Sequence, residues 1–364
     1  MKGIYQLSFV TVLSIFLCSC TKEVTYHRDN IEPQLLVNAQ MTVGDTLHLV
    51  YLAISKDITV EKIKSGSVRC LVNGKPMADA VLDDRDDDLF ITNERTGLLD
   101  NKASGMKQTR FSFKAEFKPG DIVRIEAEAN DGAFKAASEV IVPKAPEIVI
   151  ADTLYQKDPS KPDSFTSGEY RIRLKGKDFA GENNFYRIKM GFSRIDRMFK
   201  NADEDNDAKE WDSIWDFHYI TLDKGNDAIL NDGAPVEDLD LYDTSENLFR
   251  VFSDKLFSDG TFNIGLTMPS LAVNEKPTTT EEFDRAEAES TLSVIVSGIT
   301  EDEYNYLKAL SIYMFRDESI MTEPVSFPDN VEGGVGLVSI STPSIASVKF
   351  HRTFSEGGGI IWTY

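Results

Sequence analysis

The sequence predicts a mainly β protein with one conspicuous helix. Short apolar or alternating runs recur along the chain, and turn-forming pairs such as Asn73-Gly74 and Asp131-Gly132 separate them. Within residues 122–129, apolar side chains alternate mainly with charged ones, which indicates a half-buried antiparallel strand. One segment, beginning at Thr300, instead carries the spacing and the capping residues of a helix.

The first residues have the pattern of a secretory signal. Lys2 is followed by an apolar stretch over residues 9–17, which falls short of the roughly 20 residues that span a bilayer. Leu17, Ser19 and Cys20 then resemble the bacterial lipobox, in which the chain is cut before the cysteine and its thiol is diacylated, typically with palmitate. We therefore expect a signal peptide over residues 1–19 and lipidation of Cys20. An ordinary signal with a chance cysteine is the alternative.

Residues 20–32 are polar and charged, as suits a flexible tether between the lipid and a folded body. Lys22-Glu23 is loosely similar to the export signal of Bacteroidota surface lipoproteins. We expect an outer-membrane protein held by its lipid anchor. The sequence leaves open whether it faces the cell surface or the periplasm.

Composition limits the range of partners. Removing 19 residues from 364 leaves 345, which is about two domains. The formal net charge is −21, or −22 once the signal with its single Lys2 is gone, so we expect no nucleic-acid binding. After cleavage and lipidation, Cys70 is the one ordinary thiol, and its strand-like surroundings favour a buried small hydrophobe over a nucleophile.

Residues 33–143 are predicted to form an immunoglobulin-like or fibronectin-like sandwich, because about seven short strands fit into roughly 110 residues. Residues 83–105, which open with the acidic run 83–88, are interpreted as an excursion between strands. The predicted strands cover residues 35–41, 46–53, 67–72, 110–117, 122–129 and 133–142.

Residues 144–364 are predicted to form a β-rich C-terminal domain that follows a proline-punctuated join. Its helix begins with the capping box Thr300-x-x-Glu303. Up to about Phe315 it presents one stripe, which consists of Tyr304, Leu307, Ser311 and Met314 with Leu310 beside them. The predicted strands cover residues 147–155, 169–175, 185–195, 217–222, 249–252, 262–268, 292–299, 336–341 and 347–354.

The C-terminal part carries a family resemblance. The helix segment 299–308, the Glu323-Pro-Val segment and the loop Asn330-x-x-Gly-Gly-x-Gly resemble a family of Bacteroidota lipoproteins known only as a domain of unknown function. Residues 34–40 resemble the family's opening strand. The resemblance implies a lipobox, an N-terminal sandwich and a C-terminal β domain. Members are often encoded beside TonB-dependent receptors, which implies a role in uptake. The family has no established catalytic residues to transfer.

Two acidic or glycine-rich segments invite a ligand interpretation. Asp203, Asp205 and Asp207 begin like a calcium loop, but Ala208 and Ile214 replace the glycine and glutamate that the helical-hand motif needs. A looser calcium site and a solvated acidic loop both remain open. Residues 331–336 lack the Lys and Ser/Thr of a phosphate loop, so a structural turn is expected there, with Gly334 a candidate for positive φ.

Aromatic residues cluster within an acidic stretch, where they serve either core packing or an exposed platform for sugars or partners. They are Trp211, Trp215, Phe217 and Tyr219.

No segment brings a nucleophile, a base and an orienting group into a recognisable motif, and the four His are scattered at positions 27, 48, 218 and 351. We therefore expect no enzyme activity, no cofactor and no catalytic residue. The favoured function is an accessory or binding subunit of an envelope complex, with a TonB-dependent receptor as a candidate partner. A glycan-binding or glycan-cleaving surface lipoprotein and an adhesin are the alternatives.

Overall fold

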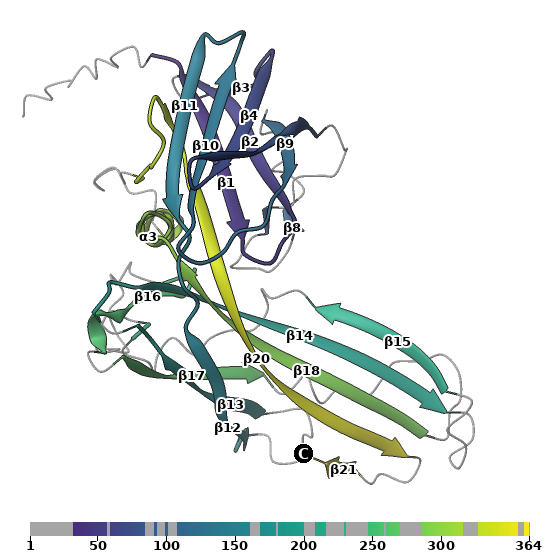
Figure 1. Ribbon diagram of the computed structural model, residues 1–364. Helices are drawn as coiled ribbons and strands as arrows, with labels where there is room; N and C mark the ends of the chain where they lie inside the picture. The colour runs from purple at the N-terminus through teal and green to yellow at the C-terminus, as the bar shows by residue number, and fades with distance from the viewer. Residues whose placement is uncertain are drawn as a thin grey trace, which may run out of the picture.

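The mainly β prediction is confirmed. Over its described residues, the computed structural model is built from strands and carries one long helix (Figure 1). Among the described residues, no helix is long and apolar enough to cross a membrane. The described residues are 32–56, 59–83, 91–92, 99–100, 108–160, 168–179, 181–199, 208–215, 229–230, 247–257, 260–269, 285–315, 327–355 and 360–363.

The first sandwich encloses one core between two sheets. Its inner faces follow the predicted alternation, so that Val123, Ile125 and Ala127 of β10 are at most 2% exposed. The predicted hairpin turns at Asn73-Gly74 and Asp131-Gly132 have positive φ at all four residues. One sheet contains β1 (Gln34–Thr42), β2 (Leu47–Lys56), β3 (Thr59–Glu61), β6 (Val81–Leu82) and β9 (Thr109–Lys114), and the other contains β4 (Gly66–Val72), β5 (Lys75–Asp79), β10 (Ile122–Ala129) and β11 (Phe134–Ile141).

A separate two-stranded ladder joins β7 (Ile91–Thr92) to β8 (Leu99–Asp100).

The second sandwich packs a long-stranded sheet against a three-stranded one around a second core. Tyr170 and Leu174 from the small sheet meet Ile188, Val294 and Phe350 from the large one. The large sheet contains β14 (Phe185–Phe199), β15 (Ala208–Trp215), β16 (Val251–Ser253), β18 (Arg285–Ile299), β20 (Val338–Ser355) and β21 (Ile360–Thr363), and the small one contains β12 (Glu147–Lys157), β13 (Gly168–Lys177) and β17 (Thr261–Pro269).

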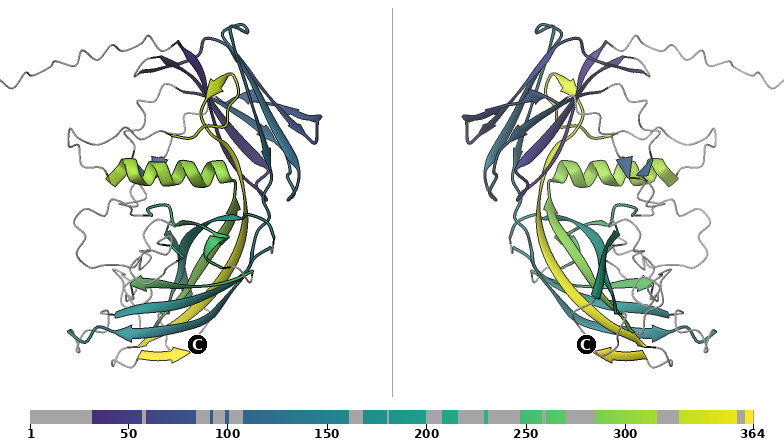
Figure 2. Two further views of the ribbon diagram at one scale, coloured as in Figure 1. Left: turned by 90° about the vertical axis from the view of Figure 1, so that its left-hand side faces the viewer. Right: turned by 90° about the vertical axis from the view of Figure 1, so that its right-hand side faces the viewer.

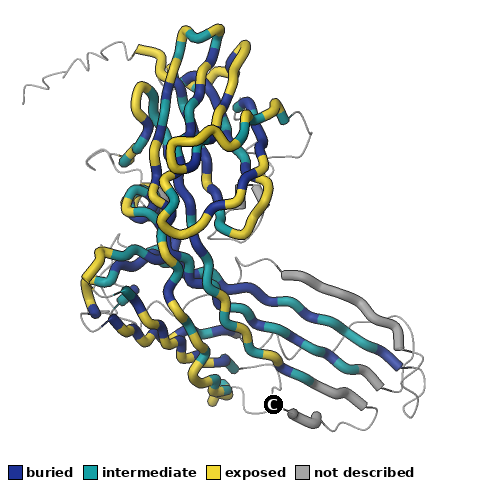
Figure 3. Tube along the Cα trace, viewed as in Figure 1, coloured by how far each residue is buried: buried dark blue, intermediate teal, exposed yellow. Residues whose placement is uncertain are grey.

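The long central strands of the second sandwich are buried or half-buried along their described lengths. No described position of β14 or β18 is exposed, and Figure 3 shows both strands as buried or half-buried along their described lengths. The predicted strand over residues 217–222 lies outside the described residues.

β20 corrects the prediction of two separate final strands, over residues 336–341 and 347–354. It is one continuous strand that changes partner part-way. Residues 338–341 pair with β1 of the first sandwich, and residues 342–355 pair with β18 of the second. Pro343 comes just after this change of neighbour and pairs with Ser297 of β18.

This strand joins the two sandwiches into a single sheet path that crosses both. The first core contains Val338 and Ile340 of β20 and Val331 of the preceding loop, beside residues from 35 to 142. The boundary between residues 143 and 144 therefore separates the two parts along the sequence. In space, however, residues of the C-terminal part complete the first core.

Helix α3 (Glu301–Phe315) lies at the level between the two sandwiches, as both side views show (Figure 2). Its first half packs through Tyr304 and Leu307 against Phe249, Val251 and a third small core. The 3-10 turn η4 (Asp254–Leu256) follows β16 beside it. Tyr304, Leu307 and Ser311 are buried, which confirms the predicted stripe over these residues, and the side chain of Met314 lies outside the described part.

Candidate functional site

The residues that the sequence singled out for lipid and metal lie outside the described part of the chain. These are Cys20 and the calcium candidates Asp203, Asp205 and Asp207. Trp211 and Trp215 belong to β15, whereas Phe217 and Tyr219 are outside the described residues. Among the residues that are described, no three His, Cys, Asp or Glu side chains gather closely enough to hold a metal ion.

Two side chains that could in principle react, a thiol and an imidazole, are instead core residues. Cys70 is fully buried, and burial raises the pKa of its thiol to about 12, so it is a packing residue rather than a nucleophile. His48 is 3% exposed, and its Nε2 lies 3.0 Å from the Ala115 carbonyl oxygen between the rings of Phe113 and Phe117. Burial lowers the pKa of His48, which favours the neutral ring.

The segment that links the sandwiches is fastened to the large sheet. Thr342 Oγ1 donates to the Pro143 carbonyl at 2.6 Å, and Ser344 Oγ donates to the Pro146 carbonyl at 2.5 Å. Gly298 of β18 lies so close to the Lys144 carbonyl oxygen that any Cβ there would collide with it. The link is therefore a packed layer on β18 and β20 rather than a loose hinge.

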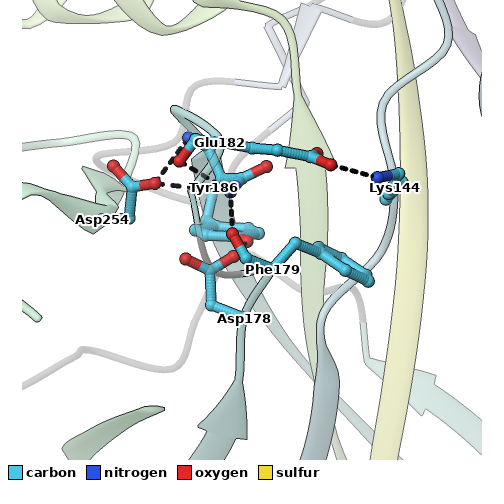
Figure 4. Close-up of polar contacts among 7 residues, drawn as sticks. Lys144, Asp178, Phe179, Glu182, Tyr186 and Asp254 are labelled. Carbon is cyan, nitrogen blue, oxygen red and sulfur yellow. Dashed lines mark hydrogen bonds and ion pairs between the residues drawn. The ribbon is translucent and has the colours of Figure 1, made fainter. Parts of the chain in front are cut away.

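A polar cluster continues this joint (Figure 4). Lys144 Nζ lies 2.5 Å from Glu182 Oε1 and 5.0 Å from the centre of the Phe179 ring. Both partners belong to the loop between β13 and β14, so the link and the second sandwich hold each other. Because both charged groups are half-exposed, the ion pair itself contributes little stability.

The inner side of the cluster is buried and contributes more to stability than the exposed ion pair does (Figure 4). The Tyr186 hydroxyl donates to Asp178, and the pKa of Tyr186 is raised by burial and by that hydrogen bond. Asp254 Oδ2 accepts the Asn184 backbone N–H at 2.8 Å, which ties η4 to the start of β14. These bonds fix the edge of the second core.

Tyr186→Phe is expected to lower the free energy of unfolding by about 2 kcal/mol, because Asp178 would stay buried without its hydroxyl donor. Urea denaturation measures the change. Tyr313→Phe is the matched control at a side chain that is 59% exposed, and it should stay within about 0.5 kcal/mol of wild type. Equal effects of the two substitutions would contradict this role for the hydroxyl.

Glu303 occupies the predicted capping position, but only half of the capping box forms. Its backbone N–H donates to Thr300 Oγ1 at 3.2 Å, as predicted. The carboxylate does not reach back to Thr300 and is buried beside Arg187 and Ser339. Burial raises the pKa of Glu303, against the opposing effects of Arg187, the Ser339 hydrogen bond and Lys189. This acid lies where α3, β14 and β20 meet.

Glu303→Gln is expected to gain stability relative to wild type as the pH rises. A carboxyl whose pKa is raised in the folded state destabilises that state increasingly as pH climbs above the unfolded value of about 4.3. Below both pKa values the effect is absent. Urea unfolding between about pH 4 and pH 7 measures the difference, with exposed Glu301→Gln run in parallel. A difference that shrinks as pH rises would contradict the assignment.

The glycine-rich loop over residues 330–336 has a structural role and helps to hold the two sandwiches together. The Asn330 side chain brackets Val338, accepting its N–H at 2.9 Å and donating to its carbonyl at 2.8 Å, and also donates to Asp302 of α3 at 3.2 Å. Gly333 and Gly336 have φ of +73° and +129°.

Gly334 corrects the expectation of positive φ at that position, because its φ is not positive. It is required for a different reason. It runs parallel to β1, and a Cβ there would collide with the Leu35 carbonyl oxygen.

A cleft of about 590 Å³ opens between the outer face of β1 and β2 and helix α3. It is formed by both parts of the chain, since Tyr51 comes from β2 and Tyr306 from α3. The amides of Asn38, Gln40 and Gln108 also line it. Aromatic faces combined with amide donors and acceptors suit a neutral polar ligand.

Comparison with known protein families identifies the family of this chain. Residues 21–345 match the family described as Domain of unknown function (DUF4249). The chain belongs to this family. No curated protein matches the DUF4249 chain.

Among solved structures, the DUF4249 chain is similar to the crystal structure of a DUF4785 family protein from Legionella pneumophila, with 8% sequence identity and a TM-score of 0.20. That match covers 71% of this chain and 51% of the other, so the chain spans about half of the solved protein's length.

Proposed function

We propose that this DUF4249 chain is an outer-membrane lipoprotein, anchored through lipid on Cys20, that serves as a non-enzymatic binding or accessory subunit of an envelope complex. A TonB-dependent receptor is the proposed partner. The observation that carries the proposal is the continuous strand β20, which pairs with β1 in one sandwich and with β18 in the other. The resemblance to lipoproteins that are often encoded beside TonB-dependent receptors suggests the partner.

A body joined in this way suits a binding subunit. The hydroxyl bonds from Thr342 and Ser344 fix the link, so surfaces on both sandwiches are held in one arrangement before a partner arrives. Such preorganisation lowers the entropy lost on association and so favours affinity. A tether over residues 20–32 would give the body reach while the lipid keeps it at the membrane.

The cleft favours a second candidate, a glycan-binding surface lipoprotein. Tyr51 and Tyr306 contribute aromatic rings to its lining, and Asn38, Gln40 and Gln108 contribute amides. Among the described lining residues Asp45 is the one acid, whereas hydrolysis of a glycosidic bond ordinarily uses a pair. The cleft therefore supports binding of a glycan better than cleavage.

Affinity purification of the tagged, lipid-anchored protein in a mild detergent separates the two candidates. We expect a stoichiometric outer-membrane receptor in the eluate, identified by mass spectrometry. A protein that elutes alone but binds polysaccharide would instead support the glycan candidate. In that case Tyr306→Ala should weaken polysaccharide binding, while Tyr313→Ala, at an exposed position of the same helix, should not.

A further inference from the structure

The outer face of β13 carries a row of cations in an acidic protein. Alternation along this strand places Tyr170, Ile172 and Leu174 in the core, each at most 1% exposed. The intervening side chains are exposed, and Figure 3 shows the same alternation along the small sheet. They form a cationic stripe that consists of Arg171, Arg173, Lys175 and Lys177.

The stripe is unusual for this chain, which has 39 Lys and Arg against 60 Asp and Glu. Arg171 pairs with Glu169 at 2.8 Å. Within the part of the chain that the structure describes, the side chains of Arg173, Lys175 and Lys177 form no ion pair or hydrogen bond. These three cations are therefore available to an external anion.

The two neighbouring strands differ in charge. On the β12 side, Asp152 lies opposite Arg173 and Glu147 lies opposite Lys177. On the β17 side, the stripe faces uncharged residues, which in register are Thr267, Gly265, Asn263 and Thr261. Positive potential is therefore concentrated over β13 and β17.

Gly265 makes a groove beside Arg173. A strand glycine usually weakens a sheet and often marks a close approach by a ligand or another chain. Neither positive φ nor crowding explains it here, because its φ is not in the positive region and a Cβ would meet nothing within 4 Å. The resulting groove is about 540 Å³, and its polar lining consists of Arg171, Arg173, Asn263 and Thr267 together with one acid, Asp152.

We propose that this face, the cationic stripe with its Gly265 groove, docks an extended acidic peptide segment of a partner protein. Alternate residues of a strand are about 6.7 Å apart, a repeat that the alternate side chains of an extended peptide share. Arginine suits carboxylates because its planar guanidinium can bond both oxygens. The described groove lining contains no aromatic ring on which a sugar could stack, which favours a peptide over an anionic polysaccharide.

The negative charge of the rest of the molecule favours docking of an acidic partner at this face over other faces. A net charge of −21 repels an acidic partner elsewhere, so complementary charge at one face selects where the partner docks. The inference rests on the proposed role as a protein-binding subunit and adds the chemistry of the partner.

The test uses the full processed protein in mild detergent and a fluorescent peptide in which glutamate alternates with threonine. We expect binding that weakens with salt and falls about tenfold when glutamine replaces glutamate. Arg173→Glu with Lys175→Glu should also reduce affinity about tenfold. The matched control, Lys75→Glu with Lys114→Glu, makes the same charge change on exposed strand residues of the first sandwich and should bind like wild type.

A second variant probes shape rather than charge. Gly265→Val should weaken peptide binding by about threefold or more while leaving the melting temperature unchanged or higher, because a β-branched side chain fits a strand. Equal binding of the glutamine peptide, equal loss in both double variants, or tighter binding of polygalacturonate than of the peptide would overturn the proposal.

Failure of this inference and failure of the proposed function give different results. A receptor that co-purifies equally with wild type and with the Arg173→Glu, Lys175→Glu variant would preserve the accessory role and reject the stripe as its docking face. Selective peptide binding by a protein that co-purifies with no partner would preserve the docking face and reject the accessory role.

Discussion

Gly334→Ala is expected to lower the free energy of unfolding by about 3 kcal/mol. The new Cβ would collide with the Leu35 carbonyl oxygen and lie 3.0 Å from the Ala136 Cβ. Because Gly334 pairs with Leu35 in the parallel ladder between β19 (Gly334–Val335) and β1, relief would require the strands to separate. Urea denaturation followed by tryptophan fluorescence and by circular dichroism measures the loss.

Gly265→Ala is the matched control for this substitution. Gly265 is also a strand glycine without positive φ, but a Cβ there meets open space. Alanine at 265 should therefore be neutral or raise stability by up to about 1 kcal/mol. If Gly334→Ala melts like wild type, or if both alanine variants lose the same stability, the close approach of β19 to β1 is not what holds the joint.

Cys20→Ser is expected to abolish lipid attachment completely and to leave the folded body intact. The thiol is the atom that the lipobox resemblance assigns to acylation, and Cys20 precedes both described cores. Metabolic labelling with a radioactive fatty acid should mark the wild type and leave the variant blank. The variant should also leave the membrane fraction, because the proposed lipid anchor on Cys20 would be lost.

Cys70→Ser provides the control, because its thiol is buried in the first core and should not be a site of acylation. This variant should keep its label, although a buried hydroxyl in place of the thiol is expected to lower its stability. Label retained by Cys20→Ser, or no label on wild type, would end the lipoprotein proposal.

Patterns among neighbouring residues predicted much of the fold. The strand β10 and its hairpin to β11 were predictable because alternation and an Asp-Gly turn act over neighbouring residues. The helix was predictable from Thr300 onward for the same reason, since its cap and its stripe are local signals. Glu303 departs from the capping box because its carboxylate is buried against Arg187 and Ser339, which come from other strands.

The path of β20 was not predictable, because it depends on partners distant in sequence. Its first residues pair with β1, about 300 positions earlier, and its later residues pair with β18. Likewise, Gly334 carries no sign in the sequence of which carbonyl it will approach.

The candidate surfaces were missed for two different reasons. The cleft combines Tyr51 with Tyr306, so no local motif could reveal it. The cationic stripe was visible in principle, since Arg171, Arg173, Lys175 and Lys177 alternate in the sequence. A search for contiguous basic runs does not detect it, whereas a search at the period of a strand does.

Site-specific photo-crosslinking in intact cells tests most directly whether this protein binds a protein partner through the small sheet. A photoreactive residue replaces Asn263, which is exposed opposite Lys175, or Ser67, an exposed strand residue of the first sandwich. We predict a crosslink from position 263 to one outer-membrane receptor and none from position 67. No protein captured at 263, or the same proteins captured at both positions, would contradict the account.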